Sequence, residues 1–190
     1  MEEVIVGAVI GVIGTVIGTV VGWILNSFSN RGKLHIYLKK WTDSFQYVKA
    51  GVMITSTCIE ETTFYSYDLS VDIYNSSAEP RIMRDVRIVF NDRKNDVETS
   101  FPNDEQTKRV VYGSYFYEGL EALTIPAKSV INLKLRDGKN KDNTASLYIW
   151  KAKKVFFVYR DYKNKQHRIL IKNEDYSKYF ENHLQEKKNG

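Results

Sequence analysis

The sequence predicts a mainly β protein. We expect an antiparallel β-sandwich of the immunoglobulin-like kind, with a single transmembrane helix before it and a helix after it. Three observations support this prediction. A long uncharged stretch opens the chain, and several later segments alternate apolar with polar side chains. Aromatic residues make up 13% of the chain, which suits the faces of β-sheets. A small closed β-barrel is the alternative architecture.

The opening stretch carries no charge from Val4 to Asn30. As an α-helix, the segment from Val4 to Leu25 would be roughly 33 Å long, enough to cross the apolar core of a bilayer. Trp23 lies near one end, where interfacial aromatic residues are common. The acidic start and the lack of a small-residue cleavage site argue against a cleavable signal peptide. We therefore expect a transmembrane helix, and its length disfavours the alternative of a buried soluble helix.

Five of the eleven glycines lie in this stretch and form a candidate helix-packing face. At about 100° per residue, they fall within roughly 80° of arc, opposite a bulky face that carries Val12, Val16 and Trp23. Small residues spaced four apart let membrane helices approach closely. Because the chain has one candidate span, the expected partner is a second copy of the chain. The proposed oligomerisation face consists of Gly7, Gly11, Gly14, Gly18 and Gly22.

The flanking charges predict an orientation in the cell membrane. Glu2 and Glu3 precede the stretch, whereas Arg31 and Lys33 follow it. Because an excess of Lys and Arg marks the cytoplasmic side, we expect a short outer N-terminus and a cytoplasmic β domain. Cys58 is the only cysteine, which fits a reducing compartment. The glycosylation triplet at residues 75–77 would then have no role.

Six segments predict the main strands, the first four by period-two alternation of apolar and polar residues. They are residues 33–41, 65–75, 85–92, 129–138, 154–161 and 166–173. The last two flank the sequence YKNK and are expected to form a hairpin. The predicted inward residues of three of these strands are Tyr67, Leu69, Val71, Ile73, Val86, Ile88, Phe90, Ile131, Leu133 and Leu135. Further candidate strands are residues 51–58, 107–117 and 146–150.

The chain thus divides into a helix and polar linker over residues 1–30, a β domain over residues 31–173, and a C-terminal helix or tail over residues 174–190. In the tail, Tyr176, Tyr179, Phe180 and Leu184 follow the spacing of one helix face. Acidic residues come early in it and lysines come late, as the helix dipole favours.

No catalytic constellation is visible, and we expect no enzyme, cofactor or metal. His35, His167 and His183 lie far apart and form no metal-ligand pair, and Cys58 has no cysteine partner. No phosphate-binding loop, nucleophile elbow or dinucleotide-binding motif occurs after a strand.

Two groups of residues are candidates for binding. Tyr112, Tyr115 and Tyr117 surround Gly113 and could stack on a base. A basic group near the predicted hairpin could contact phosphate, which together with the aromatics suggests a nucleotide or a nucleic acid. This group consists of Arg160, Lys163, Lys165 and Arg168. The alternative is a sheet core with a basic loop.

The layout of residues 4–25 followed by strands resembles the small membrane effectors of bacterial anti-phage systems, some of which join membrane helices to a β-barrel and respond to cyclic oligonucleotides. The resemblance is one of architecture. It implies a sensor domain that clusters the spans and disrupts or perforates the membrane. The implied partners are membrane lipid, further copies of the chain, and either a nucleotide second messenger or a protein trigger. The competing hypothesis is a passive membrane tether that recruits a protein.

Overall fold

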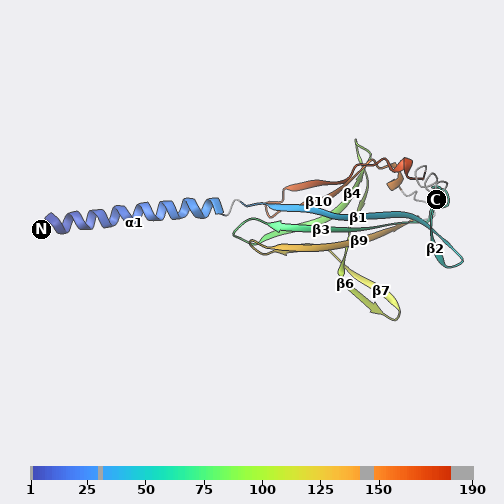
Figure 1. Cartoon of the computed structure of the whole chain (residues 1–190), viewed down its shortest axis with the longest axis horizontal. Coiled ribbons are helices and arrows are strands. Elements are labelled where there is room, and N and C mark those ends of the chain that lie inside the picture. Colours follow the sequence, from blue (N-terminus) through green and yellow to red (C-terminus); the bar gives the residue numbers. More distant parts are fainter. Residues whose placement is uncertain (1, 30–31, 142–147, 181–190) are drawn as a thin grey trace.

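The computed structural model describes residues 2–29, 32–141 and 148–180, with the side chains of the N-terminal helix described from Gly11 to Ser27. Helix α1 (Glu2–Ser29) extends from one end of a β-sandwich (Figure 1). All strand pairs within the described residues are antiparallel. The predicted mainly β, two-sheet fold is confirmed.

Two sheets form the sandwich. The first has the order β2 (Val52–Thr55), β1 (Leu34–Lys49), β3 (Phe64–Asn75), β9 (Val130–Asn140), β6 (Asn103–Val111), β7 (Ser114–Gly119). The second has the order β11 (Gln166–Lys172), β10 (Lys154–Arg160), β4 (Arg81–Asn91), β5 (Asp96–Ser100), and β8 (Ala122–Ile125) also pairs with β4. β6 meets β9 only at Asn103 and Asp104, so the β6–β7 hairpin projects from its sheet (Figure 1).

The core lies between the sheets, on the faces that the alternation predicts. The inward residues predicted in β3 are at most 2% exposed, and those of β4 are also buried, as are Leu133 and Leu135 of β9. Ile131 packs against the edge of this core. β1 is longer than expected and has a bulge between Leu38 and Lys40. Past the bulge, the buried aromatic residue is Phe45, which packs on the Tyr65 ring.

Three local expectations differ from the structure. Residues 107–117 are not one strand but a hairpin, because Tyr112 and Gly113 both have positive φ and make its turn. The strand expected at 146–150 is wrong where the structure describes it: Tyr148–Lys151 is the 3-10 helix η1, which buries Ile149 in the core. The C-terminal segment begins with a further 3-10 turn, η2 (Tyr176–Lys178), and residues 181–190 lie outside the described residues.

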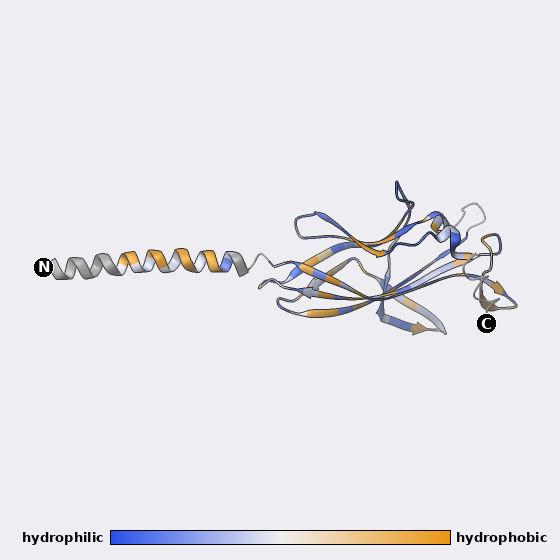
Figure 2. Cartoon of the chain, turned by 45° about the horizontal axis from the view of Figure 1, so that its top comes forward, coloured by the Kyte–Doolittle hydropathy of each residue, from blue (hydrophilic) through white to orange (hydrophobic). Residues whose placement is uncertain are grey.

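Helix α1 stands apart from the sandwich with its apolar side chains uncovered. Trp23 is 70% exposed and Leu25 is 64% exposed. Figure 2 shows orange bands alternating with pale ones along the described part of this helix. Among the residues with described side chains, no helix combines the length and the hydropathy needed to cross a membrane.

The segment after α1 is docked on the β3–β4 turn. The backbone N–H of Lys33 donates to Ser76 Oγ over 2.9 Å. The Lys33 carbonyl accepts from the Ser76 backbone N–H and from its hydroxyl, each over 3.0 Å. A Cβ atom on Gly32 would lie 2.3 Å from the backbone nitrogen of Ser77, so only glycine fits this approach. The β domain therefore fixes the chain direction just after the helix.

Replacing Gly32 by alanine should detach this segment, since the Ser76–Ser77 backbone cannot move aside as a flexible side chain could. We expect amide hydrogens at Lys33 and Ser76 to exchange about tenfold faster in the full-length protein in detergent, measured by mass spectrometry. Gly119→Ala is the control, because a Cβ at that position meets nothing within 4 Å. Unchanged exchange in the Gly32 variant would contradict the docking.

Candidate functional site

A cavity of about 560 Å³ opens at the end of the sandwich nearest α1, between the start of β1 and the β10–β11 turn. We call it the cationic cavity, because four basic side chains and one carboxylate line it. Its lining residues are Gly32, Lys33, Leu34, Arg81, Ile82, Tyr159, Asp161, Tyr162, Lys163, Lys165 and His167. The volume lies in the range of small-ligand sites.

Asp161 organises the turn that forms one wall of the cavity. Its Oδ1 accepts from the backbone N–H groups of Lys163 (2.9 Å) and Lys165 (3.0 Å). Its Oδ2 pairs with Nε2 of His167 over 2.9 Å. Burial raises the pKa of Asp161, but these hydrogen bonds outweigh burial and lower it overall. The carboxylate is thus committed to holding the turn, and the two lysine side chains project from a fixed backbone.

Two tyrosines line the cavity, one buried and one exposed. Tyr159 is 4% exposed and stacks on the His167 ring, with centroids 4.9 Å apart. Burial, with a smaller contribution from the Asp161 charge, raises the Tyr159 pKa to about 12. Tyr162 is exposed, and the adjacent Arg81 and Lys163 lower its pKa. The Arg81 guanidinium and the Lys163 ammonium lie 5.0 and 5.5 Å from the centroid of the Tyr162 ring.

The structure brings two of the four predicted phosphate-binding residues together. Lys163 and Lys165 line the cationic cavity. Arg160 lies at the end of β10 and pairs with Asp85 over 3.1 Å instead. Arg168 makes a two-pronged contact with Asp96, with N–O distances of 2.7 and 3.2 Å.

The arginine–carboxylate contact at Arg168 lowers the pKa of Asp96. Both predicted arginines are therefore engaged by carboxylates outside the cavity.

The predicted stacking residues lie elsewhere, on the β6–β7 hairpin of the other sheet. Tyr112 is at the hairpin turn and fully exposed. The Tyr115 ring carries the ammonium of Lys108 at 4.0 Å from its centroid. The Tyr117 hydroxyl accepts from Arg136 over 3.2 Å. The aromatic and basic groups therefore do not form one nucleotide site.

The predicted packing face lies on α1. A Cβ at Gly11, Gly14, Gly18 or Gly22 would meet nothing within 4 Å. Gly7 belongs to residues 2–10, whose side chains are outside the described part of the helix.

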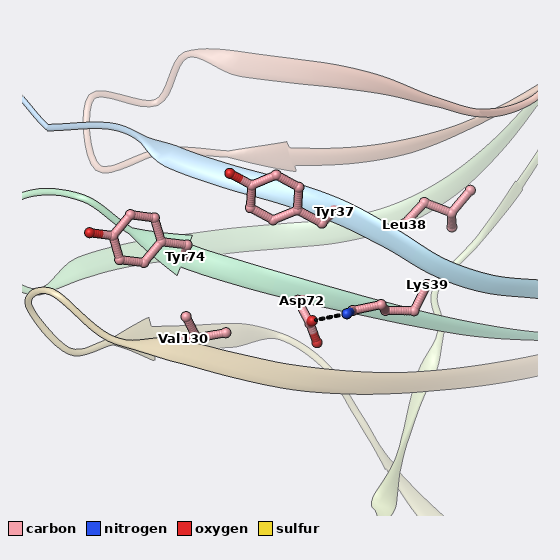
Figure 3. A pocket seen from close by; sticks show the side chains of 6 residues that line it. All are labelled: Tyr37, Leu38, Lys39, Asp72, Tyr74 and Val130. Atoms are coloured by element: carbon pink, nitrogen blue, oxygen red, sulfur yellow. Dashed lines mark ion pairs between the residues drawn. The ribbon is translucent and has the colours of Figure 1, made fainter.

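Two other hollows lie on the outer face of the first sheet, and each contains an ion pair. One, of about 540 Å³, is lined by aromatic and apolar residues around an ion pair (Figure 3). In it, Lys39 Nζ lies 2.8 Å from Asp72 Oδ2, and this hydrogen bond lowers the pKa of Asp72. The other, of about 450 Å³, lies where β6 leaves the sheet. There Arg136 pairs with Asp68 and Glu105.

Sequence reasoning missed Arg81, Tyr162 and the role of Lys33 in the cavity. Arg81 follows a turn and is far from the hairpin in sequence, so only the pairing of β4 with β10 brings it to the site. Its guanidinium donates to Ser77 Oγ (3.1 Å) and to the Gly32 carbonyl (3.4 Å). Tyr162 lies within the predicted YKNK turn. Its position beside the lysines in the sequence was the one signal that could have placed it in this site.

Comparison with known proteins agrees with the two-sheet fold. Residues 32–172 match the family described as the YopI Ig-like domain. This range begins at the docked glycine and ends with β11. No curated protein matches the sequence.

Similar solved structures include two bacterial proteins. One is described as the ApaA protein of Bordetella pertussis. It is 8% identical with a TM-score of 0.34, and the match covers 74% of this chain and 89% of that one. The other is a β-sandwich protein from Clostridium difficile 630. It is 11% identical with a TM-score of 0.34, and the match covers 75% of this chain and 91% of that one.

Proposed function

We propose that the β-sandwich of this chain, which belongs to the YopI Ig-like domain family, is a cytoplasmic sensing module. We further propose that α1 anchors this module in the cell membrane as a single span. In this proposal, α1 also associates with other copies of itself. The chain then acts as a membrane-disrupting or pore-forming effector, as its architectural resemblance to anti-phage effectors suggests.

The observation that carries the proposal is the uncovered apolar surface of α1. From Val12 to Leu25 its large apolar side chains are at least 40% exposed. The uncharged sequence begins earlier still, at Val4. An apolar surface of this size is normally buried against another apolar phase. A lipid bilayer buries such a surface when the helix is long enough to span the bilayer.

The polar groups on the helix are compatible with lipid. The Thr15 hydroxyl donates to the Gly11 carbonyl, and the Thr19 hydroxyl donates to the Thr15 carbonyl, each over 2.8 Å. Because no water is available in a bilayer core, hydroxyls there need such internal partners. These bonds support a helix that enters lipid without unpaired donors at these two positions.

Bulky residues on the glycine face should separate the helices. We expect Gly14→Leu together with Gly18→Leu to weaken self-association by about tenfold or more, about 1.4 kcal/mol, because the backbones can no longer approach closely. Crosslinking of the full chain in native membranes measures this. Val16→Leu, on the opposite face, is the matched control. Equal crosslinking of all three proteins would exclude the glycine face as the contact.

A second candidate function is a passive tether that recruits a protein. The β6–β7 hairpin favours it, since this projecting element exposes Tyr115 and Phe116. Replacing α1 by an unrelated membrane anchor separates the two functions. The effector then loses membrane permeabilisation, measured as dye uptake by expressing bacteria, whereas a tether retains its partner.

A further inference from the structure

We propose that the cationic cavity binds the phosphate of an anionic lipid headgroup. This inference rests on the proposed insertion of α1 into a membrane. Within the described residues, the ammonium groups of Lys33, Lys163 and Lys165 take part in no ion pair. These three lysines line one cavity together with Arg81. A phosphate is the ligand whose charge and acceptor oxygens match such a group.

The single carboxylate of the cavity does not neutralise these cations directly. Asp161 directs Oδ1 to two backbone N–H groups and Oδ2 to His167. Asp161 therefore forms no ion pair with the lysine ammonium groups and does not compete with a ligand for them. By contrast, the hollow drawn in Figure 3 holds a lysine and an aspartate that pair with each other. The cationic cavity differs from that hollow because its three lysines pair with no carboxylate of the described chain.

The walls of the cavity are fixed before any ligand arrives. The Asp161 backbone N–H donates to the Lys165 carbonyl over 3.0 Å, and the Asn164 N–H donates back to the Asp161 carbonyl over 2.9 Å. These bonds close the turn around a residue, Asn164, that has a φ of +62°. Arg81 is held on the opposite wall by Ser77 and Gly32. A preformed site loses less entropy on binding than a flexible one.

The position of the cavity selects a lipid over a soluble phosphate. Gly32 is three residues after the end of α1, so its Cα lies within roughly 11 Å of that of Ser29. The headgroup layer of each leaflet is about 5–7 Å thick. If α1 spans the bilayer, the cavity mouth lies at or just beyond this layer. Tyr162, exposed beside the lysines, is of the amphipathic type enriched at this depth.

The test uses the full chain in lipid nanodiscs and follows hydrogen exchange at residues 161–166. With discs containing phosphatidylglycerol, we expect exchange there to slow about fivefold relative to discs of phosphatidylcholine alone. Lys163→Glu with Lys165→Glu should abolish this slowing. Lys49→Glu with Lys94→Glu is the control, because it makes the same charge change at two exposed lysines of the far end.

Glycerol phosphate added to phosphatidylcholine discs distinguishes the two sources of phosphate. If glycerol phosphate slows exchange by the amount expected for the lipid and phosphatidylglycerol does not slow it, the cavity binds a soluble phosphate. The lipid assignment is then overturned. If neither slows exchange, or if the control variant loses the effect equally, the proposed site is wrong. Co-elution of the chain with the discs is read separately. A chain that fails to co-elute refutes the membrane anchor, whatever the exchange shows.

Discussion

Replacing Asp43 by alanine should lower the free energy of unfolding by about 3–5 kcal/mol. The Asp43 side chain is 6% exposed, and its Oδ2 accepts hydrogen bonds from the hydroxyls of Tyr65 (2.9 Å) and Tyr176. Its Oδ1 lies 3.1 Å from Nζ of Lys172. Burial raises the pKa of both tyrosines, so they remain donors at ordinary pH. Without the carboxylate, two buried hydroxyls lose their acceptor.

Chemical denaturation of the full chain in detergent, followed by tryptophan fluorescence, measures this loss. Tyr176→Phe removes one hydrogen bond and keeps the ring, so it should cost about 1 kcal/mol. Glu60→Ala, at an exposed carboxylate with no ion pair in the described chain, should change stability by less than about 0.5 kcal/mol. An Asp43 variant no less stable than the Glu60 variant would show that the cluster contributes nothing to folding.

Replacing Asn75 by aspartate should be comparably damaging, at about 3–5 kcal/mol near neutral pH. Asn75 is fully buried. Its Nδ2 donates to the carbonyls of Glu79 (2.8 Å), Ile125 (3.1 Å) and Pro126 (3.0 Å), while its Oδ1 accepts from Ser77. A carboxylate would place a negative oxygen against three carbonyl oxygens. The same contacts occupy the amide that glycosylation of this triplet would need.

The pH dependence identifies the cause. Burial should raise the pKa of the introduced carboxyl group above its unfolded value of about 3.9. Its destabilisation must then grow as the pH rises from this unfolded value through the folded one. Asn95→Asp, in an exposed turn, is the control and should show no such growth. A stability difference from wild type that stays constant between about pH 4 and pH 8 would contradict the contacts described here.

The sequence alone predicts the parts of this fold that depend on local periodicity. In β3, the alternation of Tyr67 and Leu69 with polar neighbours follows from one face meeting the core, and the structure agrees. The short strands β5 and β8 escaped prediction because four or five residues hold too little periodic signal. The bulge in β1 could not be predicted, since it arises from its pairing with β3.

Only the residues of the candidate site that lie close together in sequence could be predicted. Lys163 and Lys165 stand out because they flank a recognisable turn. Their convergence with Arg81 depends on the register of β4 against β10, which no pattern within either strand specifies. The same holds for Asp43, a polar residue on an inward face. Two of its three partners, Lys172 and Tyr176, come from the far end of the chain, which no local pattern around Asp43 indicates.

The departure of β6 from its sheet has a consequence for crowding. Along Val130–Lys134, it leaves the side of β9 opposite β3 without a neighbouring strand in the described chain. Such an edge can template strand exchange between molecules. Two features of this edge oppose strand exchange. The Gln106 amide occupies the Asn132 carbonyl over 3.1 Å, and Lys134 adds a charge that an incoming strand would have to dehydrate. Both features disfavour the addition of a strand from a neighbouring molecule at this edge of the sheet.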